Sequence, residues 1–430
     1  MPASPSTARV INDRLALRLL QQEGPLTAGQ LKQLTGLSRP TVADLVERLT
    51  AAGLIAVVGE TGEQRRGPNA KVYGIVADRA HLAALDVRTE GVSVAVADLV
   101  GRVLAEASVP IGGDTGTGPA VEQAVTLVEH VAKEAGAGRL HTVGIGAPGL
   151  IDPSSGELRD STGLPEWHRR FVATLQERLP EARVSVENET NLAALAEQRD
   201  GAARDRDTFV LLWLGHGTGA AVVLDGALRR GASGGTGEIG FLPVPGTTAL
   251  PSSTDCEGGF HSLASSAAVV ELAAECGVPV EPGQGVSRVG VVRAAAGVVR
   301  GAVAQVREEG AAAGPASGSP EEPPPAAPAP AASFLDALAD RLAVGVASVV
   351  AILDPGCVVL GGEVGEAGGE ELAARVRDRI ARMTPLPTEV RTTALGGGAV
   401  LRGALLTARD RAQEELFTPG ERLPQPSPGW

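Results

Sequence analysis

The chain opens with apolar residues at helical spacing. Ile11, Leu15 and Leu19 recur every four residues and are joined by Ala16 and Leu20, which predicts a helix over residues 9–23 with one buried apolar face. Gly24, which a proline follows, is expected to end this helix because proline cannot continue the backbone hydrogen-bond ladder.

A second, shorter helix is predicted directly after this turn. Thr27 and Gln30 have the spacing of a capping box, which marks a helix start. The same pattern predicts that Leu31 and Leu34 are buried. Gly36 then allows a tight turn, because glycine adopts left-handed backbone angles without strain.

A third helix is predicted to begin at Ser38, whose hydroxyl can cap the first backbone N–H groups, and to end before Gly53. Pro40 is compatible with its first turn. The residues expected to face inward are Val42, Leu45, Val46 and Leu49. Three helices in this order form a helix-turn-helix.

Two predicted strands, residues 54–58 and 71–75, enclose a glycine-rich, basic segment at 59–70. This hairpin is typical of a winged helix, which would place the third helix in the major groove of double-stranded DNA and the wing beside the phosphates or the minor groove. The residues predicted to contact DNA are Ser38, Arg39, Thr41, Arg48, Arg65 and Arg66. The alternative is a winged helix that only mediates protein contacts.

After residue 78 the pattern changes to short apolar strands. Strands at 82–86, 91–98 and 103–109 form a predicted antiparallel meander, and a helix at 119–135 and a strand at 143–147 follow. Further strands are expected at 184–187, 209–214 and 219–224. A meander, a helix and a parallel strand, repeated in the second half, predict an α/β body with the two lobes of an actin-like ATPase.

Charge separates the first part of the chain from the rest. Residues 1–80 have a formal charge of +3 and the remaining 350 residues −16, which favours DNA binding confined to the head. Aromatic residues are 2% of the chain, so stacking on single-stranded nucleic acid has few candidate rings. Three scattered cysteines, Cys256, Cys276 and Cys357, predict a cytoplasmic protein without a disulfide framework. Because no apolar run reaches the ~18 residues of a membrane helix, no membrane partner is expected.

Five segments carry a family resemblance. They read V-G-I-G-A-P-G-L-I-D at 143–152, E-N-E-T-N-L-A-A-L-A-E at 187–197, L-G-H-G-T-G-A-A-V-V-L-D-G at 214–226, G-E-I-G at 237–240 and L-D-P-G-C-V-V-L-G-G at 353–362. The chain from about residue 80 to 415 resembles the ROK family, which groups sugar kinases and sugar-responsive transcriptional repressors. The head sequence L-T-G-L-S-R-P-T-V, followed by R-R-G-P-N-A, is similar to the winged heads of the repressor branch.

The resemblance implies a DNA-binding winged helix-turn-helix at residues 1–78 and a two-lobed effector and oligomerisation domain at 79–417. Residues 310–332 are almost wholly Ala, Pro, Gly, Ser and Glu. Such a composition buries too little apolar surface to offset the entropy of ordering, so we expect a disordered insertion there. The proline-rich tail at 418–430 is also expected to be disordered.

The ATP site of the family is incomplete in this chain. ROK kinases have an Asp-x-Gly-Gly-Thr turn whose backbone N–H groups hold phosphates, whereas residues 86–90 read Asp-Val-Arg-Thr-Glu. Both glycines are missing, and Glu90 would repel phosphate. The second phosphate loop keeps its glycines but has His216 where the family usually has threonine. No cofactor is therefore expected.

The catalytic base of the family is also altered. It is the aspartate of an Asn-Asp-x-Asn motif, which deprotonates the sugar hydroxyl that attacks the γ-phosphate. Glu189 stands at this position, one methylene longer, which displaces the carboxylate by on the order of 1 Å. The resemblance thus implies a body without catalysis, and the alternative is an active ATP-dependent sugar kinase of the glucokinase type.

The structural zinc site of the family is degraded as well. A histidine after Gly-Glu-Ile-Gly and three cysteines complete a tetrahedral site in relatives. The corresponding positions here are Phe241, Ser252, Thr254 and Gly259. Cys256 lies out of register, so no metal is expected, and packing by Phe241 and Phe260 is predicted to replace it.

A sugar pocket remains by resemblance. Asn188 and Glu189 would bind sugar hydroxyls, and Glu238 would bind those near the anomeric carbon. His261 stands where relatives have a second sugar-binding glutamate, and Phe241 replaces a sugar-contacting histidine. The alternative is that Asn188 and Glu238 only satisfy hydrogen bonds between the lobes.

Together these features predict a transcriptional regulator, most simply a repressor, that binds operator DNA as a symmetric homodimer or homotetramer. A carbohydrate effector between the lobes would favour one lobe closure and move the heads out of register with their half-sites. The alternatives are the sugar kinase and a DNA-binding protein that responds to no ligand.

Overall fold

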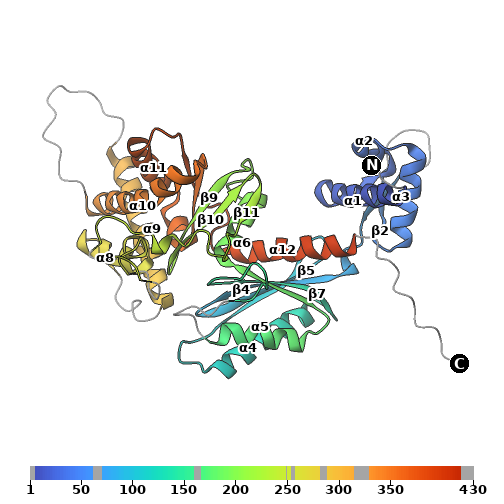
Figure 1. Ribbon diagram of the computed structural model, residues 1–430, viewed down its shortest axis with the longest axis horizontal. Helices are drawn as coiled ribbons and strands as arrows, with labels where there is room; N and C mark the ends of the chain where they lie inside the picture. Colours follow the sequence, from blue (N-terminus) through green and yellow to red (C-terminus); the bar gives the residue numbers. More distant parts are fainter. Residues whose placement is uncertain are drawn as a thin grey trace.

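The computed structural model describes residues 5–61, 70–158, 166–247, 249–252, 257–280, 288–313 and 329–417. A small helical head lies at one end, and two α/β lobes form the rest (Figure 1). The described ranges contain one three-stranded sheet and two five-stranded sheets. This arrangement confirms the predicted winged head and two-lobed α/β body.

The head contains three helices and a small sheet. The helices are α1 (Pro5–Glu23), α2 (Ala28–Thr35) and α3 (Arg39–Ala51). The strands are β1 (Leu26–Thr27), β2 (Ile55–Thr61) and β3 (Ala70–Ile75), in the order β1-β3-β2. The predicted capping box, the Ser38 cap and the four inward-facing residues of α3 are all confirmed.

The buried faces of α1 and α2 differ from the predicted ones. Three leucine or isoleucine side chains expected inside are exposed, namely Ile11 (55%), Leu15 (38%) and Leu34 (50%). Ala16 and Leu20 are buried on α1 as predicted, and Leu17 completes the buried face, because Asp13 on the same face is held against α3 by an ion pair with Arg48. Helix α2 has only eight residues and buries Leu31 alone.

The first lobe is a five-stranded sheet in the order β6-β5-β4-β7-β8. Strands β4 (His81–Arg88), β5 (Gly91–Asp98) and β6 (Val103–Pro110) form the predicted antiparallel meander. Strands β7 (Leu140–Ala147) and β8 (Arg183–Asn188) extend the sheet in parallel pairing. Helices α4 (Thr117–Glu134) and α5 (Trp167–Arg178) cover one face (Figure 1).

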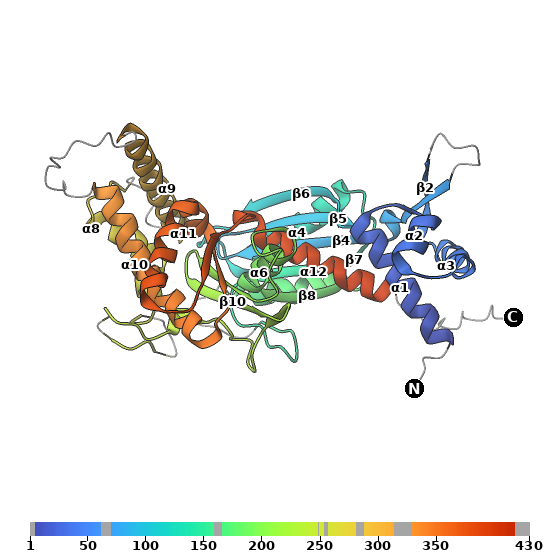
Figure 2. The same cartoon turned by 90° about the horizontal axis from the view of Figure 1, so that it is seen from above.

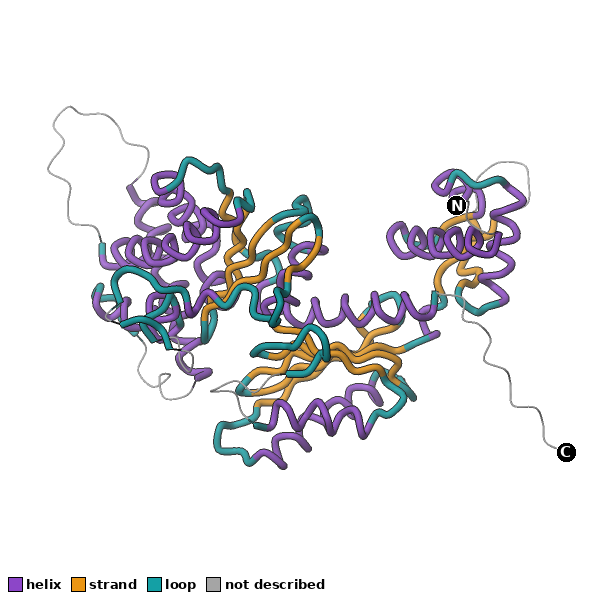
Figure 3. Tube along the Cα trace, in the orientation of Figure 1, coloured by secondary structure: helices purple, strands orange, loops and turns teal. Residues whose placement is uncertain are grey.

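The second lobe repeats this topology, as predicted, in the order β11-β10-β9-β12-β13. Strands β9 (Phe209–Leu214), β10 (Thr218–Leu224) and β11 (Ala227–Arg229) form the meander, and β12 (Cys357–Gly361) and β13 (Glu389–Thr392) pair in parallel. The helices on this lobe are α7 (His261–Ala264), α8 (Ser266–Glu275), α9 (Arg288–Ala313), α10 (Pro330–Leu353) and α11 (Gly362–Met383). Figure 3 shows the two sheets as separate layers with helices around them.

Two helices pack against each other between the sheets. Helix α6 (Glu189–Asp200) contacts the second sheet, and α12 (Ala399–Leu416) covers the first. A Cβ at Gly144 of β7 would lie 2.5 Å from the carbonyl oxygen of Ala404, so glycine is required for α12 to approach the sheet this closely. Helix α12 continues beyond the sheet to the head in both views (Figures 1 and 2).

The head and the body share a joint at the end of α12. Gln413 Nε2 donates hydrogen bonds to Gln21 Oε1 at 2.8 Å and to the Leu99 carbonyl at 2.9 Å. Gln21 Nε2 donates to the Val100 carbonyl at 3.2 Å. One cluster of buried apolar residues includes residues of the head, the first lobe and the end of α12, where Phe417 is 6% exposed. The head is therefore packed onto the body and not only tethered to it.

Both ends of the predicted disordered insertion are helical. Residues 310–313 end α9, and residues 330–332 begin α10. Alanine is a strong helix former and Pro330 is compatible with a first helical turn, which explains the difference from the prediction. Residues 314–328 and the tail at 418–430 lie outside the described residues. None of the helices in the described ranges has the length and apolarity to cross a membrane.

The packing of Phe260 yields a stability prediction. Its ring is fully buried against Gly345 of α10, where an added Cβ would overlap it, so Gly345→Ala is expected to destabilise the fold by about 1–3 kcal/mol. Gly297→Ala in α9 is the matched control, because its Cβ would meet no atom within 4 Å, and it should stabilise by roughly 0.5–1 kcal/mol. Thermal unfolding followed by circular dichroism measures both, and equal midpoints for the two variants would contradict the packing described.

Candidate functional site

The N-terminal end of α3 presents polar side chains on the head. Ser38 and Arg39 are exposed and Thr41 is half-buried. Ser38 Oγ accepts a hydrogen bond from the Thr41 N–H at 3.3 Å and lies 2.8 Å from Thr41 Oγ1, so both hydroxyls take part in the helix cap. Within the described ranges, the side chain of Arg39 makes no hydrogen bond or ion pair. Its guanidinium is thus available to a phosphate or a guanine edge.

Arg48, which was also predicted to contact DNA, forms ion pairs inside the head. Its Nη2 lies 2.6 Å from Asp13 Oδ1 on α1, and its Nη1 pairs with Asp44 one turn earlier on α3. Because Asp13 is 7% exposed, this contact fixes α1 against α3. Arg48 therefore has a structural role, and its contact with DNA stays a prediction. Arg65 and Arg66 lie outside the described residues.

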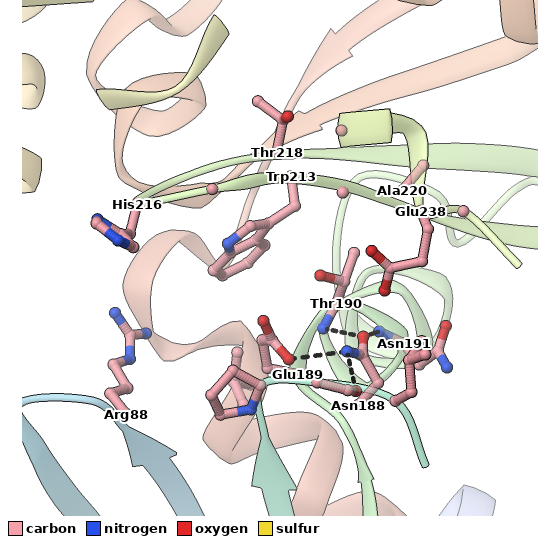
Figure 4. Close-up of a pocket in the computed structure, with 18 of the residues that line it drawn as sticks. Arg88, Asn188, Glu189, Thr190, Asn191, Trp213, His216, Thr218, Ala220 and Glu238 are labelled. Atoms are coloured by element: carbon pink, nitrogen blue, oxygen red, sulfur yellow. Dashed lines mark hydrogen bonds between the residues drawn. The ribbon is translucent and has the colours of Figure 1, made fainter. Parts of the chain in front are cut away.

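A cavity of about 500 Å³ opens between the two lobes. Its walls come from the end of β4, the loop after β7, the β8–α6 junction and the β9–β10 turn. The four residues predicted to bind ligand, Asn188, Glu189, Glu238 and His261, all line it. Figure 4 shows Glu189 and Glu238 reaching toward the same space from opposite walls. The structure thus brings the predicted ligand residues together.

Asn188 is committed to local hydrogen bonds. Its Oδ1 caps α6 by accepting from the N–H groups of Thr190 and Asn191 at 2.9 and 3.2 Å. Its Nδ2 donates to the Gly149 carbonyl at 3.1 Å and to Glu189 Oε2 at 2.9 Å. These partners follow strands of the first lobe, so Asn188 does not link the lobes and instead positions Glu189 at the cavity wall.

The two glutamates facing the cavity have raised pKa values. Burial, together with the charges of Glu238 and Asp86, raises the pKa of Glu189 to about 8. Burial also raises the pKa of Glu238 above the ordinary range. At pH 7 the Glu189 carboxyl is therefore mostly protonated.

Arg88 joins the two lobes at the cavity. Its Nε lies 3.0 Å from Asp86 Oδ2 in the first lobe, and its Nη1 pairs with Glu363 at the start of α11 in the second. Its Nη2 donates to the Gly397 carbonyl at 3.4 Å, in the turn just before α12. Burial raises the pKa of Asp86, and the Arg88 charge opposes that shift. Segment 86–90, the position of the phosphate-binding turn expected from the family resemblance, thus carries an ion-pair bridge.

Two lining residues, Trp213 and Glu363, were not predicted from the sequence. Trp213 is 9% exposed, and its indole faces the cavity above Glu189 (Figure 4). Aromatic faces pack well against the apolar faces of sugar rings. A tryptophan directly before the glycine-rich turn at 215–219, in a chain with three tryptophans, was the available signal. Glu363 directly follows the Gly-Gly pair at 361–362, but no neighbouring residue in the sequence indicated Arg88 as its partner.

The positions of the altered zinc site were only partly predicted. Phe241 is 40% exposed and lines the cavity, so the expectation that it replaces a metal by packing is wrong. The short helix at 239–241 directs it away from the core, whereas Phe260 is fully buried as expected. Among the described positions, Phe241 and Gly259 offer zinc no ligand, and Thr254 and Cys256 lie outside those ranges. The absence of zinc stays a prediction.

His261 lines the cavity at the start of α7. Burial lowers the pKa of its imidazole, and the nearby His216 lowers it further. His261 is therefore neutral at pH 7 and can donate one hydrogen bond and accept another.

The winged head and the cavity between two actin-like lobes define a class of protein: sugar-kinase-like folds that carry a winged-helix head. The ROK family model matches residues 82–313 and 326–411, and a MarR family model matches residues 12–67. The chain belongs to the ROK family.

Curated relatives of similar sequence are regulators. The DNA-binding transcriptional dual regulator NagC of Escherichia coli (strain K12) is 26% identical over 242 residues, which are 54% of this chain and 57% of the relative. The chain thus spans somewhat more than half the length of that relative. A putative xylose repressor of Caldicellulosiruptor sp. (strain Rt8B.4) is 22% identical over 83% of this chain and 84% of its own length.

Solved structures share the fold. A ROK family transcriptional regulator, described as a homolog of the E. coli MLC protein, superposes with a TM-score of 0.70 at 20% identity over 96% of this chain and all of its own. A ROK family glucokinase from Streptomyces griseus, in complex with glucose and AMPPNP, has a TM-score of 0.58 at 25% identity over 77% of this chain and all of its own. The fold is therefore shared by regulators and kinases. Only the residues of the site can indicate which of these two functions a chain with this fold has.

Glu189 yields a pH-dependent prediction. The folded protein favours the protonated form of Glu189, because folding raises the pKa of this carboxyl from 4.5 to about 8. The wild-type protein therefore loses folding stability as pH rises from about 4.5 through 8 and the carboxyl ionises. Glu189→Gln removes the loss, so its unfolding midpoint relative to wild type should rise between pH 5 and pH 8.5 by a few degrees. Thermal melts across this range measure it. The exposed Glu157→Gln is the control, and a difference that is independent of pH for Glu189→Gln would contradict the raised pKa.

Proposed function

We propose that the protein is a DNA-binding transcriptional regulator, a repressor of sugar-related genes, whose lobes hold a carbohydrate effector and catalyse no reaction. The observation that carries this proposal is the exposed guanidinium of Arg39 at the N-terminal end of α3, in a head of charge +3 on a body of charge −16. The regulator names of the relatives support it. Such a protein would act in the cytoplasm on double-stranded operator DNA.

The head has the geometry for major-groove recognition. In helix-turn-helix proteins the N-terminal residues of the second helix of the motif contact base edges, and here that helix is α3. Ser38 and Thr41 hold the helix start, and Arg39 extends from it. Arg65 and Arg66 belong to the same proposal as phosphate or minor-groove contacts from the wing. Because one head covers only one half-site, we infer a symmetric homodimer or homotetramer.

Two features of the cavity argue against phosphoryl transfer. A protonated Glu189 cannot accept the proton of an attacking hydroxyl, and its pKa of about 8 keeps it protonated at neutral pH. Arg88 and Glu363 occupy the bridge where a phosphate-binding turn would be required. Purified protein that phosphorylates a hexose with ATP, and loses this activity in Glu189→Gln, would overturn the non-catalytic part of the proposal.

A physical connection runs from the cavity to the head. Arg88 contacts the Gly397 carbonyl directly before α12, and Val400 in the first turn of α12 lines the cavity. At the other end of the same helix, Gln413 bonds Gln21 of α1. A ligand with different affinities for two lobe closures would shift α12 and thereby the whole head.

Arg39→Ala tests the DNA contact. We expect operator affinity to fall about tenfold or more, because a base or phosphate contact of an arginine contributes ~1–3 kcal/mol. Mobility shift on the DNA upstream of the protein's own gene, repeated at several salt concentrations, measures the loss and the change in salt dependence. Arg170→Ala, an exposed arginine on α5, is the matched control. Unchanged binding by Arg39→Ala would remove α3 from the contact surface.

Gln413→Ala tests the connection through α12. The variant should bind effector sugar with the affinity of the wild type, since Gln413 is not among the lining residues, but operator affinity should respond less to the sugar. Sugar binding is measured by calorimetry and operator release by fluorescence anisotropy. Gln176→Ala, which removes a comparable hydrogen bond to the Ala182 carbonyl in the first lobe, should keep the full response. A full response in Gln413→Ala would exclude this joint as the route of coupling.

A further inference from the structure

The loop that follows β11 leaves the second lobe and reaches the first. It comprises residues 230–237, Arg-Gly-Ala-Ser-Gly-Gly-Thr-Gly, which we call the strap. Its two ends are held in the second lobe, because the Thr236 N–H donates to the Arg230 carbonyl at 3.2 Å and the Ala220 N–H of β10 donates to the Gly237 carbonyl at 2.7 Å. The strap residues that line the cavity are Gly234, Thr236 and Gly237.

Two contacts fasten the strap to the first lobe. Arg230 Nε donates to Glu187 Oε2, near the end of β8, at 2.7 Å. Gly234 lies with its backbone directly on the loop after β7, where a Cβ would stand 2.0 Å from the Ile151 carbonyl oxygen. The strap thus crosses the space between the lobes at the cavity and closes it on this side.

This attachment is weak enough to be released. The apolar side chain of the strap is that of Ala232, which is exposed, so hydrophobic burial does not hold the strap on the first lobe. The side chains of Arg230 and Glu187 are 46% and 13% exposed, and water screens an ion pair of this kind. Gly231 and Gly237 have φ angles of 74° and 91°, so a small residue that turns without strain stands near each end.

The partner of the strap also holds the start of α6. Glu187 Oε1 accepts hydrogen bonds from the Asn188 N–H and from Asn191 Nδ2, each at 3.0 Å. Glu189, which reaches into the cavity, lies between these two residues in the first turn of α6. One carboxylate therefore receives the strap on one oxygen and fixes a wall of the cavity with the other.

We propose that the strap is a releasable closure of the cavity, which the ion pair between Arg230 and Glu187 holds shut and whose release opens the cavity to solvent. Both are positioning residues, because the closed strap places Glu238 of the second lobe opposite Glu189 of the first (Figure 4). Arg88 lies on the other side of the cavity in the same view, so its bridge stays intact and the lobes open on the side of the strap. The inference concerns the body alone and goes beyond the proposed function.

Acrylamide quenching of tryptophan fluorescence in the full chain measures this opening. Trp213 lines the cavity and is 9% exposed, and its signal is the difference between each protein and the same protein carrying Trp213→Phe. Arg230→Gln should raise the quenching constant of Trp213 about twofold or more, since the loss of an exposed ion pair shifts an equilibrium by this order. Arg229→Gln is the matched control, because Arg229 is 47% exposed and pairs with Asp225 inside the second lobe at 3.3 Å. Equal quenching in Arg230→Gln and wild type would overturn the proposal.

Glu187→Gln separates the closure from a general loosening of the site. Glutamine removes the charge that Arg230 contacts but keeps a carbonyl oxygen for Asn188 and Asn191. This variant should raise the quenching of Trp213 as much as Arg230→Gln does, and the double variant should add nothing, because both single changes remove one contact. Arg230→Lys, which keeps the charge, should stay close to wild type. Additive effects in the double variant would contradict the proposal, since two independent causes would then be at work.

The backbone contact of the strap is tested by Gly234→Ala. Its Cβ would collide with the Ile151 carbonyl, so the strap must move off the first lobe and the quenching of Trp213 should rise. Gly246→Ala is the control for backbone strain, because Gly246 also has a positive φ, of 90°, but a Cβ there would meet no atom within 4 Å. Equal quenching in the two alanine variants would show that the strap does not close the cavity.

These measurements use neither sugar nor DNA, so their outcome is independent of the proposed function. If the variants leave Trp213 as protected as in wild type, the closure by the strap is wrong and the proposed regulator still depends on the Arg39→Ala experiment. If Arg39→Ala leaves operator binding unchanged, a strap that opens as expected still stands.

Discussion

The contacts of Arg88 are the interaction on which the arrangement of the lobes depends. One guanidinium links Asp86 in the first sheet, Glu363 at the start of α11 in the second lobe, and the Gly397 carbonyl before α12. Because Asp86 is 5% exposed, loss of the guanidinium would leave a buried carboxylate without compensation. The side chain that connects these three parts of the body lies in segment 86–90, where the family resemblance implies a phosphate-binding turn in kinases.

The cavity follows from the way its residues are held. Asn188 uses both of its amide atoms to cap α6 and to contact Gly149 and Glu189, so the glutamate is positioned by the fold and not by a ligand. The same burial that positions Glu189 raises its pKa to about 8. A carboxyl in this state is a poor general base at neutral pH, and the same local environment that positions the side chain accounts for this property.

The sequence predicted the architecture well because its signals are local. Capping by Thr27 and Ser38 and the strand patterns of both lobes depend on neighbouring residues alone, and all were confirmed. The predictions failed where a residue far away in the sequence determines whether a side chain is buried or which partner it contacts. Ile11 is exposed because Asp13 pairs with Arg48 across 35 residues, and Arg88 finds Glu363 across 275 residues. The four residues predicted to bind ligand were found from the family resemblance and line the cavity, whereas Trp213 and the exposure of Phe241 depend on how the cavity wall is folded.

The joint at Gln413 limits how such proteins can be recombined. Its contacts come from α1, from the turn at Leu99 and Val100 in the first lobe, and from the last turns of the chain's final described helix. Three segments that are far apart in the sequence therefore form one interface. A chimera joined at the boundary between head and body would keep only the body's side of this interface. A foreign head would therefore respond to the body only if its own surface matched both the Leu99–Val100 turn and the end of α12.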